Sequence, residues 1–95
     1  MTKKFHRDIL KRLFAMDSSE YTITLIVATQ TFSGMFSGLI IEKMENVEIN
    51  KQTVERITFD DDDKICCSTD LESILSIEQE DDDADHYNIT VGNLV

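Results

Sequence analysis

The residues that could perform catalysis are few in this chain of 95 residues: two histidines and one pair of adjacent cysteines. His6 and His86 each lie in a charged segment that we expect to be exposed, and the sequence places no serine or cysteine nucleophile beside either of them. In an extended strand, Cys66 and Cys67 would point to opposite faces, so we interpret them as small buried apolar residues that do not bridge each other. No nucleophile, base and orienting group can be named together, and we expect a protein that is not an enzyme.

Two acidic runs, Asp60–Asp63 and Glu80–Asp85, raise the question of metal binding. Clustered carboxylates suit calcium or magnesium, but a dedicated calcium loop spaces its ligands around a turn-making glycine, which Asp60–Asp63 lacks. Adventitious divalent binding and simple solubilising charge are both open interpretations of this run. We expect no dedicated metal site and no cofactor, and we predict that residues 60–63 form an exposed loop because like charges at this density cannot be buried.

The net charge of −10 is distributed unevenly along the chain. Residues 1–16 contain five basic residues and one acidic residue, a net charge of +4, so the remaining 79 residues carry −14. Such an acidic body repels a phosphate backbone at long range, which disfavours generic duplex binding. Any contact with nucleic acid should therefore be local or made through the basic N-terminal segment.

The hydrophobic periodicity predicts one helix followed by strands. Residues 3–15 have the pattern of an amphipathic helix whose basic side is either solvated or in contact with RNA or a neighbour's acidic loop. Five strands are predicted at 21–28, 31–41, 47–59, 64–67 and 71–77, with a turn at Glu42–Asn46. We assign residues 1–79 to one domain and 80–95 to an acidic tail, in which Tyr87–Val91 alternates and could form an extra strand.

Two of the three glycines lie four residues apart in the second predicted strand. Glycine within a strand usually marks sharp bending or close backbone approach, so Gly34 and Gly38 are predicted bend points. Strong curvature would let a short chain roll its sheet into a barrel. The predicted fold class is mainly β, with an N-terminal helix and a strongly bent, five-stranded antiparallel sheet that forms a small barrel.

The segment from Gly34 to Ile49 resembles the first motif of the Sm-like family, which includes the bacterial Hfq relatives. Glu42 matches the acidic position of that motif, Asn46 matches its asparagine, and Val47 and Ile49 match its third strand. The segment CCSTDLESI, Cys66–Ile74, is similar in shape to the second motif. The resemblance covers residues 3–78 and implies a helix followed by five curved strands, with strands four and five pairing with neighbours to form a ring of five to seven copies.

The resemblance also implies an RNA-binding site, formed here by Glu42, Met44, Asn46, Cys67 and Ser68. In such a site the asparagine amide reads a base edge and the acidic residue orients it. This chain departs from the pattern: Cys67 and Ser68 replace an arginine and a glycine, and Met44 stands where uridine-binding members stack a ring on the base. Loss of the cation and the ring removes affinity, so any binding of single-stranded RNA should be weak. At the Asn46 position, an asparagine that only stabilises its own turn is the alternative.

Two function classes follow from these patterns. The first is a non-enzymatic, homo-oligomeric Sm-like ring associated with RNA. The second is an acidic adaptor, or a nucleic-acid mimic, that binds a basic protein partner through its strongly negative body. No secretion signal or membrane-spanning segment is recognised, so we expect a cytoplasmic protein with no membrane contact.

Overall fold

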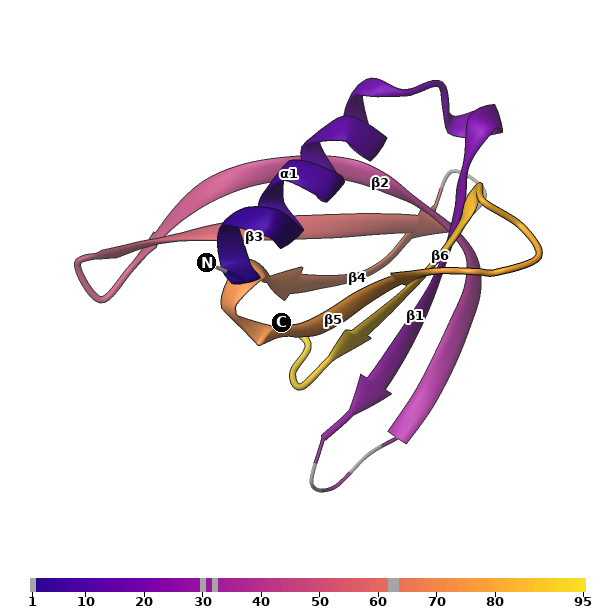
Figure 1. Cartoon of the computed structure of the whole chain (residues 1–95). Helices are drawn as coiled ribbons and strands as arrows, with labels where there is room; N and C mark the ends of the chain where they lie inside the picture. Colours follow the sequence, from indigo (N-terminus) through magenta and orange to yellow (C-terminus); the bar gives the residue numbers. More distant parts are fainter. Residues whose placement is uncertain (1, 30, 32, 62–63) are drawn as a thin grey trace.

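The computed structural model of the chain describes residues 2–29, 31, 33–61 and 64–95. One α-helix, α1 (Thr2–Ala15), precedes all the strands (Figure 1). The strands are β1 (Thr22–Ala28), β2 (Ser33–Ile49), β3 (Gln52–Asp61), β4 (Lys64–Asp70), β5 (Ile74–Gln79) and β6 (His86–Val91). Two short 3-10 helices, η1 (Ser18–Glu20) and η2 (Leu71–Ser73), lie before β1 and between β4 and β5.

Helix α1 confirms the predicted N-terminal helix and packs on the sheet through one side. Leu10 and Leu13 are fully buried in the core. His6 lies one turn before Leu10 on the same side and is only 4% exposed, so the expectation of a surface histidine is wrong at this position. After α1, Asp17 caps the N-terminus of η1 by accepting hydrogen bonds from the backbone N–H and the hydroxyl of Ser19; these bonds stabilise the carboxylate and lower the pKa of Asp17.

The six strands form one mixed sheet in the order β4-β3-β2-β1-β6-β5. Strand β6 confirms the extra strand that was the alternative for Tyr87–Val91, and it pairs in parallel with β1 and antiparallel with β5. Residues 86–91 are therefore an inner part of the sheet, and Tyr87, Ile89 and Val91 belong to the core instead of a solvated tail. The sheet has one strand more than the five predicted, and its β1–β6 pairing departs from the antiparallel expectation.

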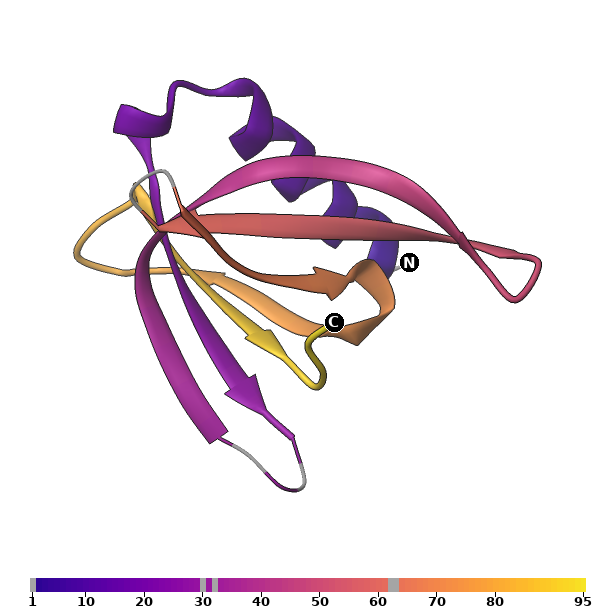
Figure 2. The same ribbon diagram turned by 180° about the vertical axis from the view of Figure 1, so that it is seen from behind.

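Strand β2 is long and strongly bent, and it connects the two halves of the sheet (Figures 1 and 2). Gly38 has φ +73°, and the register with β1 shifts between Ile23 and Leu25, so a bulge lies at this glycine. The predicted bend at Gly38 is thus confirmed. Gly34 pairs in regular register with Val27 and coincides with no bulge.

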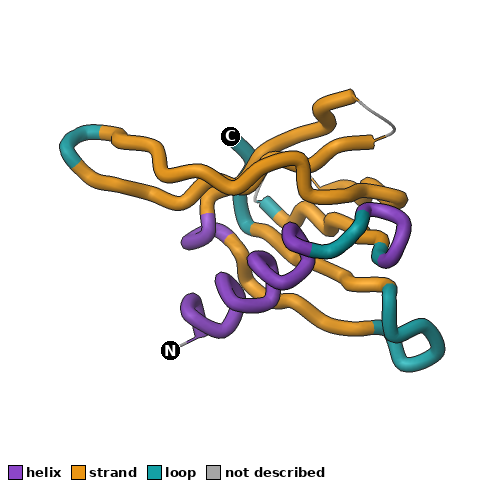
Figure 3. Tube along the Cα trace, turned by 90° about the horizontal axis from the view of Figure 1, so that it is seen from above, coloured by secondary structure: helices purple, strands orange, loops and turns teal. Residues whose placement is uncertain are grey.

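The turn between β2 and β3 lies at Asn50 and Lys51, which have φ values of +50° and +66°. Two consecutive residues with positive φ form the hairpin turn whose twist suits paired strands. The predicted turn at Glu42–Asn46 is therefore wrong, because those residues continue β2 and pair with β3. The resulting hairpin projects away from the rest of the chain (Figure 3).

The two ends of the sheet approach each other without joining. Among the described residues no ladder connects β4 to β5, so the predicted barrel is not closed. Helix η2 links these two strands, and the segment after β6 reaches β4: the backbone N–H of Val95 donates to Ser68 O at 2.8 Å, and Thr69 Oγ1 donates to Asn93 O at 2.8 Å. Within the described residues, α1 is the longest helix and is too short and too polar to cross a bilayer.

Candidate functional site

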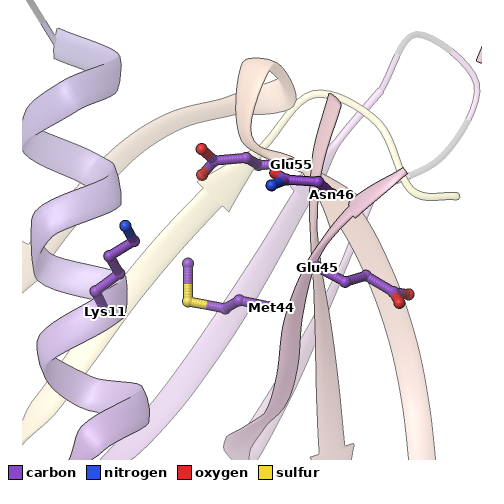
Figure 4. Close-up of a pocket in the computed structure, with 5 residues that line it drawn as sticks. All are labelled: Lys11, Met44, Glu45, Asn46 and Glu55. Atoms are coloured by element: carbon purple, nitrogen blue, oxygen red, sulfur yellow. The ribbon is translucent and has the colours of Figure 1, made fainter. Parts of the chain in front are cut away.

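A small cleft lies between α1 and the β2–β3 hairpin and contains two of the five residues predicted from the Sm-like motifs. Met44 and Asn46 project from β2 toward the helix, Glu55 projects from β3, and Lys11 reaches in from α1 (Figure 4). Glu45 borders the cleft, but its side chain points to the other side of the strand. The cleft has a volume of about 130 Å³, which is small for a drug-sized ligand.

The pairing of β2 with β3 explains why these side chains share one face. Met44 lies opposite Ile57 and Asn46 lies opposite Glu55, and residues two apart on a strand project to the same side. Met44 packs against the core, whereas Asn46 is exposed. The cleft therefore has an apolar inner end and a polar outer end.

The charges at the cleft are only partly compensated. Arg7 on α1 forms an ion pair with Glu55, with Nε at 2.8 Å from Oε1 and 3.0 Å from Oε2. Lys11, one turn further along the helix, makes no ion pair among the described residues. Lys11 is thus a cation available to a ligand beside the Asn46 amide, and sequence reasoning missed it because the helix was not placed against this hairpin.

The other three predicted residues do not line this cleft. Glu42 is exposed and lies at a register shift between Ile41 and Lys43. Cys67 and Ser68 lie on β4, on the far side of β3, opposite Phe59 and Thr58. The Ser68 hydroxyl is 3.0 Å from the Thr58 hydroxyl, so it forms a local side-chain contact within the sheet. The structure does not bring the two motifs together into one base-binding pocket.

The two cysteines differ from the expectation of opposite orientation. The ladder pairs Cys67 with Phe59 and Ile65 with Asp60, so Cys66 is an extra residue in a bulge, and both side chains pack against the core. Both cysteines are free. Burial raises the pKa of the Cys67 thiol to about 12, and its hydrogen bond with the Cys66 thiol and the charge of that neighbour act in the same direction. A thiol with so high a pKa is a poor nucleophile at neutral pH.

His86, the second histidine, belongs to a polar cluster on β1, β2 and β6. Its Nε2 lies 2.7 Å from the hydroxyl of Thr24, which also donates to the hydroxyl of Ser37 at 3.5 Å. Thr24 is only 5% exposed, so its hydroxyl is inaccessible to a substrate. The expectation of an exposed histidine is wrong here too, because His86 is half-buried and makes a side-chain contact.

The first acidic run is not wholly an exposed loop. Asp60 ends the inner part of β3 and is 5% exposed, and its Oδ1 has no hydrogen-bond partner among the described residues. Asp61 is exposed, and the other two aspartates of the run lie outside the described residues. In the part of the chain that the structure describes, no three His, Cys, Asp or Glu side chains are gathered as metal ligands.

Comparison of the chain with protein-family models, with curated proteins and with solved structures finds no match. The cleft at Lys11 and Asn46 offers one cation and one amide to a ligand, and the ends of the sheet offer unpaired backbone to another strand.

Proposed function

We propose that the protein is a non-enzymatic scaffold of Sm-like type that assembles through the two edge strands of its sheet. One observation carries this proposal: β4 and β5 are the edges, and each exposes one large apolar side chain, Ile65 at 69% and Leu75 at 59%. An edge strand presents unpaired N–H and C=O groups, and an exposed apolar side chain beside them favours pairing with another chain. Two different edges on one chain give a head-to-tail contact, which closes into a ring when the rotation permits.

Three features support an open, strongly bent sheet of Sm-like type as the unit of this assembly. The N-terminal helix covers the sheet, β2 bends at a glycine, and η2 makes a tight connection between β4 and β5. The Val95–Ser68 hydrogen bond occupies one carbonyl of β4. Among the described residues, the part of the β4 edge that precedes this hydrogen bond is Lys64–Cys67, which contains Ile65.

The assembly is tested by measuring mass in solution with light scattering after size-exclusion chromatography. The wild type should form a particle of five to seven chains, and Ile65→Asp and Leu75→Asp should each yield monomers. Met35→Asp is the matched control, since Met35 is 65% exposed but lies on β2, an inner strand. A monomeric wild type, or dissociation by Met35→Asp alone, would contradict the proposal.

Weak binding of single-stranded RNA is the second part of this proposal, and it is supported by the free cation and the amide in the cleft. Lys11 would contact a phosphate and Asn46 a base edge, while the absence of an aromatic ring keeps the affinity low. Titration of a labelled oligouridine at low salt should show weaker binding by Asn46→Ala and Lys11→Gln than by the wild type. Lys43→Gln is the control, because Lys43 does not line the cleft. Equal binding by all four proteins would remove the RNA part and leave the assembly untouched.

An acidic adaptor for a basic protein is the second candidate function, favoured by the β5–β6 connection. That connection presents Asp81, Asp82, Asp83 and Asp85 at the surface. Changing the first three to Asn should weaken binding of an oligo-arginine peptide more than changing Glu20, Glu48 and Glu78 to Gln. Equal weakening by the two triple variants would show a response to net charge alone and would eliminate this candidate.

A further inference from the structure

A second cleft lies on the other flank of α1, between the helix and the β5–β6 pair. It is lined by Phe5, Ile9 and Arg12 from α1, Ile77 and Gln79 from β5, and Tyr87 from β6. Its volume is about 280 Å³, roughly twice that of the cleft at Asn46. Tyr87 belongs to β6, which lies between β1 and β5, a feature that the Sm-like resemblance does not include.

Four of the six lining residues are aliphatic or aromatic, and one of these four is incompletely covered. Ile9 and Ile77 pack against the core, and Tyr87 belongs to it. Phe5 is 62% exposed although it lines the cleft. Burying this ring against a ligand would remove apolar area from water, which is favourable in proportion to the area.

One charged group, Arg12, lies at the cleft, and it makes no ion pair among the described residues. The other two arginines of the chain, Arg7 and Arg56, form ion pairs with Glu55 and Asp70, so Arg12 is the arginine whose guanidinium remains available to a ligand. A guanidinium binds a carboxylate with two parallel hydrogen bonds. Gln79 adds a side-chain amide that donates to Ala84 O, which fixes its position at the cleft.

We propose that this cleft binds a small apolar carboxylate, with the hydrocarbon or aromatic part against Phe5, Ile9 and Ile77 and the carboxylate on Arg12. The charge of Arg12 selects an acid over an amine or an amide of the same shape. The size of the cleft suits a ligand of about ten non-hydrogen atoms, for which a Kd of about 1 mM is expected.

The test uses sodium octanoate as the probe, with octanamide and octylammonium as matched uncharged and cationic molecules. Binding is followed by the backbone amide shifts of Ile77 and Tyr87 in ¹⁵N-labelled protein. We expect octanoate to bind several times more tightly than octanamide, and octylammonium to leave these two amides unshifted. Comparable shifts with all three probes, or no shift with octanoate at 20 mM, would overturn the proposal.

Three variants separate the roles of charge and apolar contact. Arg12→Gln should weaken octanoate binding about threefold to fivefold and leave octanamide unchanged, because an exposed ion pair contributes modestly. Phe5→Ala should weaken binding of both ligands without unfolding the protein, because Phe5 is exposed and is not part of the buried core. Lys11→Gln is the control, since Lys11 faces the other cleft (Figure 4). Weakening by Lys11→Gln equal to that by Arg12→Gln would indicate a general charge effect and contradict the assignment.

The proposal does not depend on the assembly through β4 and β5. The same titration in the Leu75→Asp variant should give the same Kd if that variant is monomeric, because Leu75 does not line the cleft. If the Phe5→Ala variant forms a smaller particle than the wild type, a second copy of the chain occupies the cleft and the carboxylate proposal is wrong.

Discussion

Gly38 allows a direct test of the backbone bend that organises the sheet. Its φ of +73° lies in the left-handed region, where a side chain with a Cβ costs about 1–2 kcal/mol. A Cβ built at this position meets no atom within 4 Å, so no steric clash adds to that cost. Replacing glycine also reduces the freedom of the unfolded chain, which offsets about 0.4–1 kcal/mol. Gly38→Ala should therefore destabilise the fold by about 1 kcal/mol.

Thermal and urea unfolding followed by circular dichroism measure this effect at one protein concentration. For a domain of this size, about 1 kcal/mol corresponds to a melting temperature lower by about 4–8 °C. Gly38→Asn should lose less than half as much, because asparagine tolerates the left-handed region. If Gly38→Ala melts at or above the wild-type temperature, or if both variants lose the same stability, backbone conformation does not explain this glycine.

Four further predictions concern the hairpin turn, the core and the half-buried Cys67 thiol. Lys51→Gly should raise the free energy of unfolding by about 0.5–1 kcal/mol, because it relieves the positive φ of +66° at that position; an unchanged urea midpoint would contradict this. Phe59→Ala should lower it by about 3–5 kcal/mol in the same assay, since Phe59 is fully buried. Cys67 should react with iodoacetamide at pH 8.5 at least about tenfold more slowly in native than in urea-unfolded protein, with modification sites read by mass spectrometry. The pKa of Cys67 in the folded protein is raised to about 12 from 9.0, so the contribution of this thiol to stability is complete below about pH 9 and is lost as the pH approaches 12. The free energy of unfolding of Cys67→Ala should therefore fall less over this alkaline range than that of the wild type.

Local patterns in the sequence predicted the helix and the bend. The spacing of Leu10 and Leu13 fixes the buried side of α1, and the alternation of Ile23, Leu25 and Val27 fixes the buried face of β1. The bend at Gly38 could be predicted because glycine inside a strand usually marks a bulge, a bend or a close approach of the backbone. Each of these signals depends on residues that are close together in the sequence.

The errors come from choices that local patterns do not determine. Acidic residues and asparagine favour turns and so predict one at Glu42–Asn46, but β2 and β3 remain paired through Val47–Val54 and the hairpin extends to Asn50. The position of β6 between β1 and β5 is set by pairing over a long sequence separation, which alternation alone cannot reveal. The bulge at Cys66 changes which face of β4 the thiols occupy, and the position of this bulge depends on the pairing with the partner strand β3.

These errors also explain why only two of the five predicted site residues lie in the cleft. Met44 and Asn46 remain on one face of β2 because that relation is local, whereas their relation to Cys67 and Ser68 required a turn that is absent. Lys11 joins the cleft only through tertiary packing of α1 on the hairpin. The first motif therefore predicted two residues of the cleft, Met44 and Asn46, but the residue that joins them in the fold is Lys11 and not a residue of the second motif.

The net charge of −10 gives the proposed functions opposite responses to salt. Assembly through β4 and β5 brings several negative chains together, so screening of their repulsion should strengthen it between 20 mM and 500 mM NaCl. Binding of oligouridine at Lys11, or of a basic peptide at the aspartates of the β5–β6 connection, depends on attraction between opposite charges and should weaken over the same range. A particle that grows in mass with salt while both ligands dissociate would support edge pairing by apolar contact and backbone hydrogen bonds. A particle that dissociates with salt would instead mean that the basic helix of one copy holds the acidic surface of the next, and the edge strands would no longer be needed to explain it.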